Sequence, residues 1–245
     1  MRREKDVKYP GNTKRKPEQT WRDVEAYLDA LQIAPDRVLE GARAASAAAG
    51  LPDIAVTPSQ GKLLYLLAKM RGARKILEIG TLGGYSTIWL ARALPGDGVV
   101  VTLEADRRHF EIARKNIVRA GLAKVVQRRL GRALDTLPKI AAEGIGPFDF
   151  FFIDADKEST TEYFDWALRL SKAGSVILVD NVIRDGEVAN ARTADARVQG
   201  IRRFNEALAR EKRVSATTLQ TVGRKGYDGF TLALVLPAAR SPRRR

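Results

Sequence analysis

The sequence predicts an α/β fold: a doubly wound, Rossmann-like sheet of seven strands, mostly parallel, with helices on both faces and one antiparallel strand. From Lys75 onward, short apolar runs alternate with segments of helical periodicity, which is typical of a parallel sheet covered on both faces. The last two apolar runs are joined by too few residues for a helical crossover, so one of these strands must run antiparallel. A length of 245 residues, 44% of them hydrophobic, allows one large domain with a buried core.

Helical periodicity predicts two leading helices, over Trp21–Ile33 and Asp36–Ala49. A third helix has a clear start. Thr57 is a favourable N-cap, Pro58 follows at the first helical position, and Gln60 completes the spacing of a capping box. Three helices therefore precede the first strand of the sheet.

The alternating part of the chain supplies seven strands and the helices between them. The predicted strands are Lys75–Glu78, Val99–Glu104, Val125–Arg129, Phe148–Asp154, Ser175–Asp180, Val214–Leu219 and Phe230–Leu236, and the helices lie near 84–94, 107–120, 132–143, 159–170 and 195–211. We therefore divide the chain into a flexible basic tail (1–20), N-terminal helices (21–56), a ligand-binding α/β domain (57–237) and a second basic tail (238–245).

The charge of the chain is concentrated at its ends. The formal net charge is +14, from 43 basic and 29 acidic residues, and the two tails carry more than half of it. Short basic tails are usually solvated, but contact with RNA is the alternative reading. With no cysteine, disulfides and thiolate chemistry are excluded. No apolar run approaches the ~20 residues of a membrane span, and the N-terminus lacks a secretory signal, so we expect a cytoplasmic protein away from membranes.

A glycine-rich loop follows the first strand, where open α/β sheets bind ligands. Gly80, Gly83 and Gly84 allow a sharp turn and a close approach of the backbone to a ligand. The spacing fits neither a Walker loop nor the G-x-G-x-x-G dinucleotide fingerprint. The loop is therefore a binding loop of another kind.

Two acidic residues indicate what the loop binds. Glu104 ends the second strand, where a carboxylate can accept both hydroxyls of a ribose. Glu78 is expected to face the same site, and a carboxylate there suits a cationic sulfonium and amino group better than a pyrophosphate. Together they favour S-adenosylmethionine. The only histidine, His109, lies on the next helix and is expected to be an exposed helical residue.

Polar side chains also follow the fourth and fifth strands. Asp154 and Asp180 should meet at one rim of the sheet, because adjacent strands lie about 4.8 Å apart. Two carboxylates so close repel unless a cation lies between them, and with the Asn181 carbonyl they make an oxygen ligand set that suits Mg²⁺. Lys157 is either a base for a coordinated hydroxyl or a solvated surface lysine, and spacing alone does not separate these readings.

Taken together, these residues resemble the cation-dependent O-methyltransferases that include catechol and caffeoyl-coenzyme A O-methyltransferases and bacterial relatives. The matching segments are Thr57-Pro58-Ser59-Gln60-Gly61, Leu77-Glu78-Ile79-Gly80-Thr81, Gly84-Tyr85-Ser86, Gly131-Arg132-Ala133, Phe148-Asp149, Asp154-Ala155-Asp156-Lys157, Asp180-Asn181-Val182 and Asp228-Gly229-Phe230. They span about three quarters of the chain, and the ordered set is far more specific than any single piece.

The resemblance implies a role for each residue of the site. Cofactor contacts are expected from Thr57, Glu78, Gly80 and Ser86 at the methionine end, from Glu104 at the ribose, from Arg132 and Ala133 at the adenine, and from Thr81 and Asp154. Asp154, Asp180 and Asn181 match the metal ligands, and Lys157 matches the lysine proposed as the catalytic base. Homodimers are common in such a family, so we expect one here.

The expected reaction is methyl transfer from S-adenosylmethionine to a metal-coordinated hydroxyl of a small ortho-dihydroxy, catechol-like aromatic. The alternative is methylation of a hydroxyuridine in transfer RNA by the same metal-assisted mechanism, which the basic tails keep open. The polar segment 189–197, with Arg192 and Arg197, either favours an anionic acceptor or faces solvent.

Overall fold

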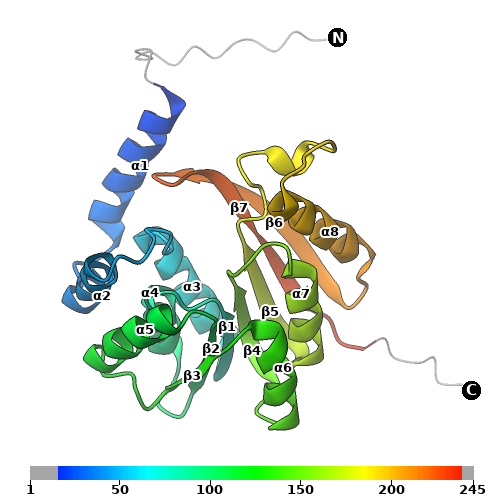
Figure 1. Ribbon diagram of the computed structural model, residues 1–245, viewed down its shortest axis with the longest axis horizontal. Helices are drawn as coiled ribbons and strands as arrows, with labels where there is room; N and C mark the ends of the chain where they lie inside the picture. Colours follow the sequence, from blue (N-terminus) through cyan, green and yellow to red (C-terminus); the bar gives the residue numbers. More distant parts are fainter. Residues whose placement is uncertain (1–15, 239–245) are drawn as a thin grey trace, which may run out of the picture.

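The computed structural model describes residues 16–238, and these form one seven-stranded sheet with helices on both faces (Figure 1). The strand order is β3-β2-β1-β4-β5-β7-β6. The strands are β1 (Lys75–Ile79), β2 (Val99–Glu104), β3 (Val126–Leu130), β4 (Phe148–Ile153), β5 (Ser171–Asp180), β6 (Val214–Gly223) and β7 (Gly226–Val235). Only β7 runs antiparallel to its neighbours, β5 and β6, so the predicted fold class is confirmed.

Helices cover the two faces as separate layers. The elements are α1 (Pro17–Gln32), α2 (Arg37–Ala48), α3 (Pro58–Arg71), α4 (Tyr85–Ala93), α5 (Arg107–Arg119), α6 (Ala133–Ala142), α7 (Thr160–Arg169), η1 (Glu187–Ala189) and α8 (Ala196–Arg210). One layer contains α2, α3, α4 and α5, and the opposite layer contains α6, α7 and α8 (Figure 1).

Each central strand contributes alternate side chains to two separate hydrophobic cores. In β4, Phe150 and Phe152 pack with α3 and α4, whereas Phe151 and Ile153 pack with α6, α7 and α8. All four side chains are almost fully buried. Because successive side chains of a strand point to opposite faces, a strand buried on both faces must be apolar along its whole length, which is the pattern of Phe148–Ile153.

The capping box predicted for α3 is present. The Thr57 side chain accepts from the Gln60 amide at 3.3 Å, and the Gln60 side chain accepts from the Thr57 amide at 3.0 Å. The reversal of strand order lies between β1 and β4, which are hydrogen-bonded neighbours. Their carboxyl ends, near Gly80 and Asp154, are therefore where a ligand is expected.

Helix α1 begins at Pro17, earlier than the predicted start at Trp21. A proline fits the first turn of a helix because its missing N–H has no helical partner there. Residues 17–20 of the predicted tail are thus helical, while residues 1–15 and 239–245, which hold most of both predicted tails, lie outside the described residues. The division into domains at residue 57 stays a prediction.

Helix α1 buries none of its own residues and lies beside the tip of the β6–β7 hairpin (Figure 1). Arg224, in the hairpin turn, forms ion pairs with Glu25 and Asp29 of α1. Polar contacts rather than a buried face therefore hold this helix. Among residues 16–238, no helix is both long enough and apolar enough to cross a membrane.

The hairpin is longer than predicted. β6 continues to Gly223 and β7 begins at Gly226, whereas the sequence pattern placed the strand ends at Leu219 and Phe230. Glycines and charged residues break the apolar pattern here, but each of these residues pairs with one on the opposite strand, up to Gly223 with Gly226. The two-residue turn Arg224–Lys225 is carried to the edge of the functional site.

Candidate active site

The glycine loop is built around contacts that exclude a side chain. Gly80 has φ 99°, in the region that favours glycine, and a Cβ added there would lie 2.0 Å from the carbonyl oxygen of Asp154. Gly84 has φ 81° and is the N-cap of α4. The loop therefore packs directly on the end of β4, and Gly80 cannot be replaced without moving one strand end from the other.

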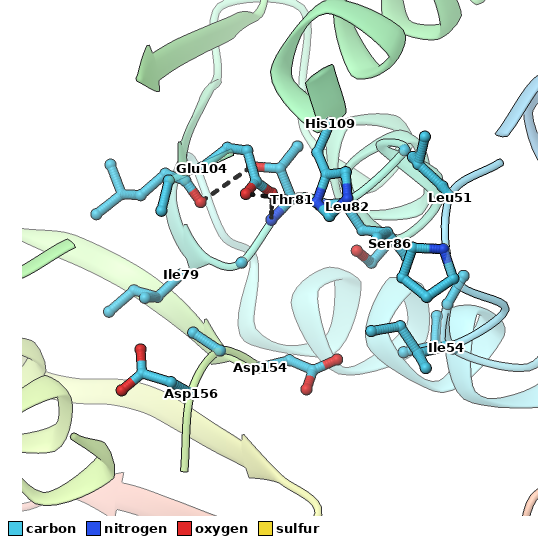
Figure 2. Close-up of a pocket in the computed structure, with 18 of the residues that line it drawn as sticks. Leu51, Ile54, Ile79, Thr81, Leu82, Ser86, Glu104, His109, Asp154 and Asp156 are labelled. Atoms are coloured by element: carbon cyan, nitrogen blue, oxygen red, sulfur yellow. Dashed lines mark hydrogen bonds and ion pairs between the residues drawn. The ribbon is translucent and has the colours of Figure 1, made fainter. Parts of the chain in front are cut away.

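A cavity of about 1140 Å³, which we call the first cavity, opens above this loop (Figure 2). Its walls include most of the predicted cofactor residues: Gly80, Thr81, Ser86, Glu104, Arg132, Ala133 and Asp154, together with Lys157 and Asn181. Figure 2 shows Glu104 and Asp154 on opposite sides of it, with Ile79 at one end. These residues lie at the carboxyl ends of β1 to β5 or in the loops and helix starts that follow them, so strand ends far apart in sequence form one ligand-sized site.

Glu104 holds the loop in place. Its Oε2 accepts from the backbone amides of Thr81 at 3.2 Å and Leu82 at 2.7 Å, and its Oε1 accepts from the Asp106 amide at 2.9 Å (Figure 2). Leu82 has φ 49°, a left-handed conformation unusual for its type. The carboxylate, 8% exposed, lines the cavity and has lone pairs left for ligand hydroxyls.

His109 is not the exposed helical residue that the sequence predicted. It lines the first cavity, its side chain is 24% exposed, and its Nδ1 lies 3.7 Å from Oε1 of Glu104 (Figure 2). The first turn of α5 starts directly after β2, so this side chain turns back over the strand end. Helical position alone carries no sign of this contact.

Glu78 is placed differently from the prediction. It is fully buried, and the first cavity is lined by its neighbour Ile79 rather than by Glu78 itself. Its Oε1 accepts from the Ser86 hydroxyl at 2.6 Å, and its Oε2 accepts from the hydroxyls of Thr102, at 2.7 Å, and Thr87. Burial raises the pKa of Glu78 to about 7, against the lowering effect of these hydrogen bonds. This carboxylate lies beneath the loop and ties it to β2 and α4.

A second cavity, of about 990 Å³, adjoins the first. It is enclosed by α1, the loop before α3, the end of β5 and the β6–β7 turn. Thr57 lies on this cavity rather than on the first, and Asp180 lines it as well. Asp154 and Asn181 line both cavities. The predicted metal ligands thus stand where the two cavities meet.

The end of β5 brings a buried carboxylate to this junction. β4 and β5 are parallel neighbours with Ile153 opposite Val179, so Asp154 and Asp180 follow at the same rim. Asp180 is 6% exposed, and its pKa is raised to about 7 by burial and then by the charge of Asp154. Asn181 has φ 59°, and its backbone N–H donates to Oδ1 of Asp180 at 2.8 Å. Two carboxylates and a side-chain amide converge here.

Only two of the three predicted metal ligands, Asp154 and Asp180, have ionisable side chains. Within the part of the chain that the structure describes, no group of three or more His, Cys, Asp and Glu side chains is placed to hold a metal ion. A buried carboxylate, a half-buried carboxylate and an amide oxygen still make an all-oxygen donor set, which fits a hard divalent cation completed by oxygens from outside the chain.

Lys157 is not a solvated surface lysine, which decides between the two readings of its position. The residue is 8% exposed and lines the first cavity. Its Nζ donates to Oδ1 of Asp154 at 2.9 Å and to the carbonyl oxygen of Asp180 at 3.2 Å. The amino group therefore lies between the two strand ends, beside the carboxylates.

Several residues of the second cavity carry no motif that the sequence pattern reveals. They are Trp21 and Val24 of α1, Arg43 of α2, Arg184 after β5 and Lys225 in the hairpin turn. Of the two arginines that the sequence suggested, Arg197 lines the first cavity and is paired with Asp195 at 2.7 Å, while Arg192 lines neither cavity.

Comparison with known proteins gives consistent matches. The family model described as "O-methyltransferase" matches residues 32–236. A catechol O-methyltransferase of Niastella koreensis is 53% identical over 217 residues, which cover 89% of this chain and 98% of the relative. The O-methyltransferase of Bacillus cereus solved in complex with SAH is 57% identical, with a TM-score of 0.87 and coverage of 89% of this chain and 99% of that one. TomG of Streptomyces achromogenes, an O-methyltransferase involved in tomaymycin synthesis and solved with SAM, is 51% identical, with a TM-score of 0.88 and coverage of 91% and 100%.

Proposed function

The chain belongs to the O-methyltransferase family, and from this premise we propose that its acceptor is a small ortho-dihydroxy, catechol-like aromatic. Membership of the family makes the protein an S-adenosylmethionine-dependent O-methyltransferase. The observation that carries the acceptor proposal is the junction of the two cavities, where Asp154, Asp180, Asn181 and Lys157 converge. The name of the relative from Niastella koreensis supports it.

Each cavity has its own part in this proposal. The first cavity would hold the cofactor, with Thr81, Ser86 and Gly80 near the methionine end, Glu104 at the ribose, and Arg132 and Ala133 at the adenine. Thr57 would contribute from the second cavity, and Glu78 from beneath the loop, where it holds Ser86. The second cavity would hold the acceptor, because it adjoins the first at Asp154 and Asn181, where the methyl group would pass; Arg43, Asp53, Ile54, Val56 and Arg184 also line both cavities.

Asp154, Asp180 and Asn181 would hold a divalent cation, Mg²⁺ in our proposal. The support is the buried carboxylate of Asp180 beside the half-buried carboxylate of Asp154: burial, and then the charge of Asp154, raise the pKa of Asp180. Such a cation, when bound, would make a hydroxyl of the acceptor more acidic. Asp154 would also orient the cofactor, since it faces both cavities.

Lys157 is the base in this mechanism. Its Nζ accepts the proton of the acceptor hydroxyl, and the oxygen electron pair attacks the methyl carbon as the carbon–sulfur bond breaks. The products are the methyl ether, S-adenosylhomocysteine and a protonated Lys157. The hydrogen bonds to Asp154 and to the Asp180 carbonyl hold Nζ at the junction and stabilise the ammonium that forms. Holding both reactants in line supplies much of the rate.

Methyl transfer from labelled S-adenosylmethionine to a catechol panel tests the proposal. We expect transfer with Mg²⁺ and loss of transfer with EDTA, with Asp154→Ala and with Asp180→Ala. Asp165→Ala, at an exposed position of α7, is the matched control and should retain activity. Full activity of Asp154→Ala and Asp180→Ala in the presence of EDTA would refute the proposed role of the metal. Absence of transfer to every catechol in the panel would refute the acceptor class.

Two further expectations stand apart from this mechanism. Neither residues 16–238 nor the names of the relatives support the hydroxyuridine alternative in transfer RNA, so we do not propose it. We propose a homodimer, on the resemblance alone, and sedimentation equilibrium of the full chain checks it.

A further inference from the structure

Three cationic side chains from separate elements line the second cavity: Arg43 of α2, Arg184 of the loop after β5, and Lys225 of the β6–β7 turn. Among the described residues, neither Arg43 nor Lys225 forms an ion pair with a carboxylate. Arg43 lies over the ring of Tyr85, 5.6 Å from its centroid, and Lys225 donates to the backbone carbonyl of Ala55. Their charges are therefore available to a ligand.

Lys225 lines the second cavity, and part of its side chain is exposed to solvent. Its pKa is lowered, mainly by burial, and the neighbouring guanidinium of Arg43 lowers it further. Asp154, Asp180 and Asp53 act in the opposite direction. The ammonium thus stands near both the proposed metal ligands and a second cation. Of these carboxylates, two would be engaged by the divalent cation, and Asp53 is exposed to solvent.

Arg184 supplies an unused hydrogen-bond donor. Its Nε is buried and has no hydrogen-bond partner among the described residues, and its nearest carboxylate, Asp228, is 3.9 Å from its Nη1. Oδ1 of Asp228 accepts from three backbone amides, those of Ile183, Arg184 and Gly229, and its Oδ2 is the atom that pairs with Nη1 of Arg184, which leaves Nε as the unused donor. A buried donor without an acceptor is costly, so this guanidinium is suited to an acceptor group brought by a ligand.

The remaining basic residues of this cavity differ from these three. Arg224 is paired with Glu25 and Asp29 of α1, and Arg22 is exposed. The cavity is also lined by apolar side chains, those of Trp21, Val24, Leu28, Leu63 and Phe230. The cavity therefore offers oxygen ligands, apolar side chains that can contact a ring, two cations without a carboxylate partner, Arg43 and Lys225, and the free Nε of Arg184.

We propose that the acceptor carries a carboxylate in addition to its two hydroxyls, and that Lys225, Arg184 and Arg43 bind this carboxylate. This inference rests on the proposed function and narrows its acceptor to catechol carboxylic acids. A guanidinium and an ammonium match a carboxylate as charge-assisted donors, and this charge favours the carboxylate over a neutral group of the same shape. Lys225 and Arg184 are specificity residues, since the methyl transfer itself does not involve them.

The experiment compares each acid with its own neutral amide. The acceptors are 3,4-dihydroxybenzoate, 3,4-dihydroxyphenylacetate and 3-(3,4-dihydroxyphenyl)propanoate, which place the carboxylate at three distances from the diol. We expect at least one acid to exceed its amide in kcat/KM by roughly 10-fold or more, the worth of a hydrogen bond to a charged group. In Lys225→Met this ratio should fall toward one, and Lys225→Arg should retain it.

A matched control and a binding measurement separate the possible failures. Lys124→Met, at an exposed lysine outside both cavities, should keep the wild-type ratio. Calorimetry with S-adenosylhomocysteine and Mg²⁺ present should show the same loss of acid binding in Lys225→Met without any turnover. Equal turnover of acids and amides, unchanged by Lys225→Met, overturns this inference but leaves the proposed function intact. Absence of both binding and transfer for acids and amides alike overturns both.

Discussion

Replacing Glu78 with glutamine should change how the stability of the protein depends on pH. Burial raises the pKa of this carboxyl from 4.5 to about 7. Between these two values the folded state keeps a proton that the unfolded state has released, so the free energy of unfolding falls as the pH rises. A difference of about 2.5 pKa units corresponds to about 3 kcal/mol, reached in full above pH 7.

Glutamine has the same shape and carries no proton that titrates in this range. Its amide can still bond to the hydroxyls of Ser86, Thr87 and Thr102, whose rotation adapts to a donor or an acceptor. We therefore expect Glu78→Gln to match the wild type near pH 4.5 and to exceed it at pH 8 by up to about 3 kcal/mol. Other groups titrate equally in both proteins, so the difference between the two curves isolates this residue.

Urea unfolding of both proteins, without cofactor, at intervals from pH 4.5 to pH 8, measures this difference. Glu162→Gln, at an exposed position of α7, is the control and should track the wild type throughout. A difference between Glu78→Gln and the wild type that stays constant across this range would show that Glu78 is charged and stabilised in the folded state, and the reasoning from burial would be wrong.

Three further predictions concern the loop, the junction and α1. Gly80→Ala places a Cβ against the Asp154 carbonyl at a positive φ, so unfolding free energy should fall by more than the ~1–3 kcal/mol of the backbone strain alone, and calorimetry should detect weaker S-adenosylmethionine binding. Mg²⁺ should raise the Tm at pH 8 and progressively less below pH 7, because Asp180 must then lose a proton on binding, which weakens the free energy of Mg²⁺ binding by about 1.4 kcal/mol per pH unit; an equal rise in Tm at pH 5.5 would contradict this. Arg224→Ala should lower global stability by at most about 1 kcal/mol but speed proteolysis within α1 and raise the KM of the acceptor, and unchanged cleavage would show that its ion pairs do not hold the helix.

The sequence predicted the sheet well wherever one local signal decided the structure. β2 has the predicted bounds, Val99–Glu104, because an uninterrupted apolar run buried on both faces has no alternative pairing. The start of α3 followed from its capping box. Strand ends then brought Gly80, Glu104 and Asp154 to one cavity, since the carboxyl ends of neighbouring parallel strands share one edge.

Features that depend on contacts between distant segments could not be predicted. The ends of β6 and β7 are set by pairing across the hairpin, and the residues there break every apolar pattern. His109 reaches the first cavity only because α5 turns back over the end of β2. Arg43 and Lys225 lie 182 residues apart in the chain and meet only at the second cavity, where α2 and the hairpin turn both reach its wall. The side of a helix or turn that faces a ligand is a property of the assembled fold.

The meeting of the two cavities at Asp154 and Asn181 also bears on inhibition. A compound that joins an adenosine-like part to a dihydroxybenzoate through a short linker would occupy both cavities at once. Binding of the first part then holds the second at a high effective concentration, so the affinities multiply when the linker matches the span. Asp154 and Asn181 are polar, so the linker should carry an oxygen where the transferred methyl group passes. A single linked molecule should therefore inhibit the enzyme more strongly than two separate compounds that compete with the cofactor and with the acceptor.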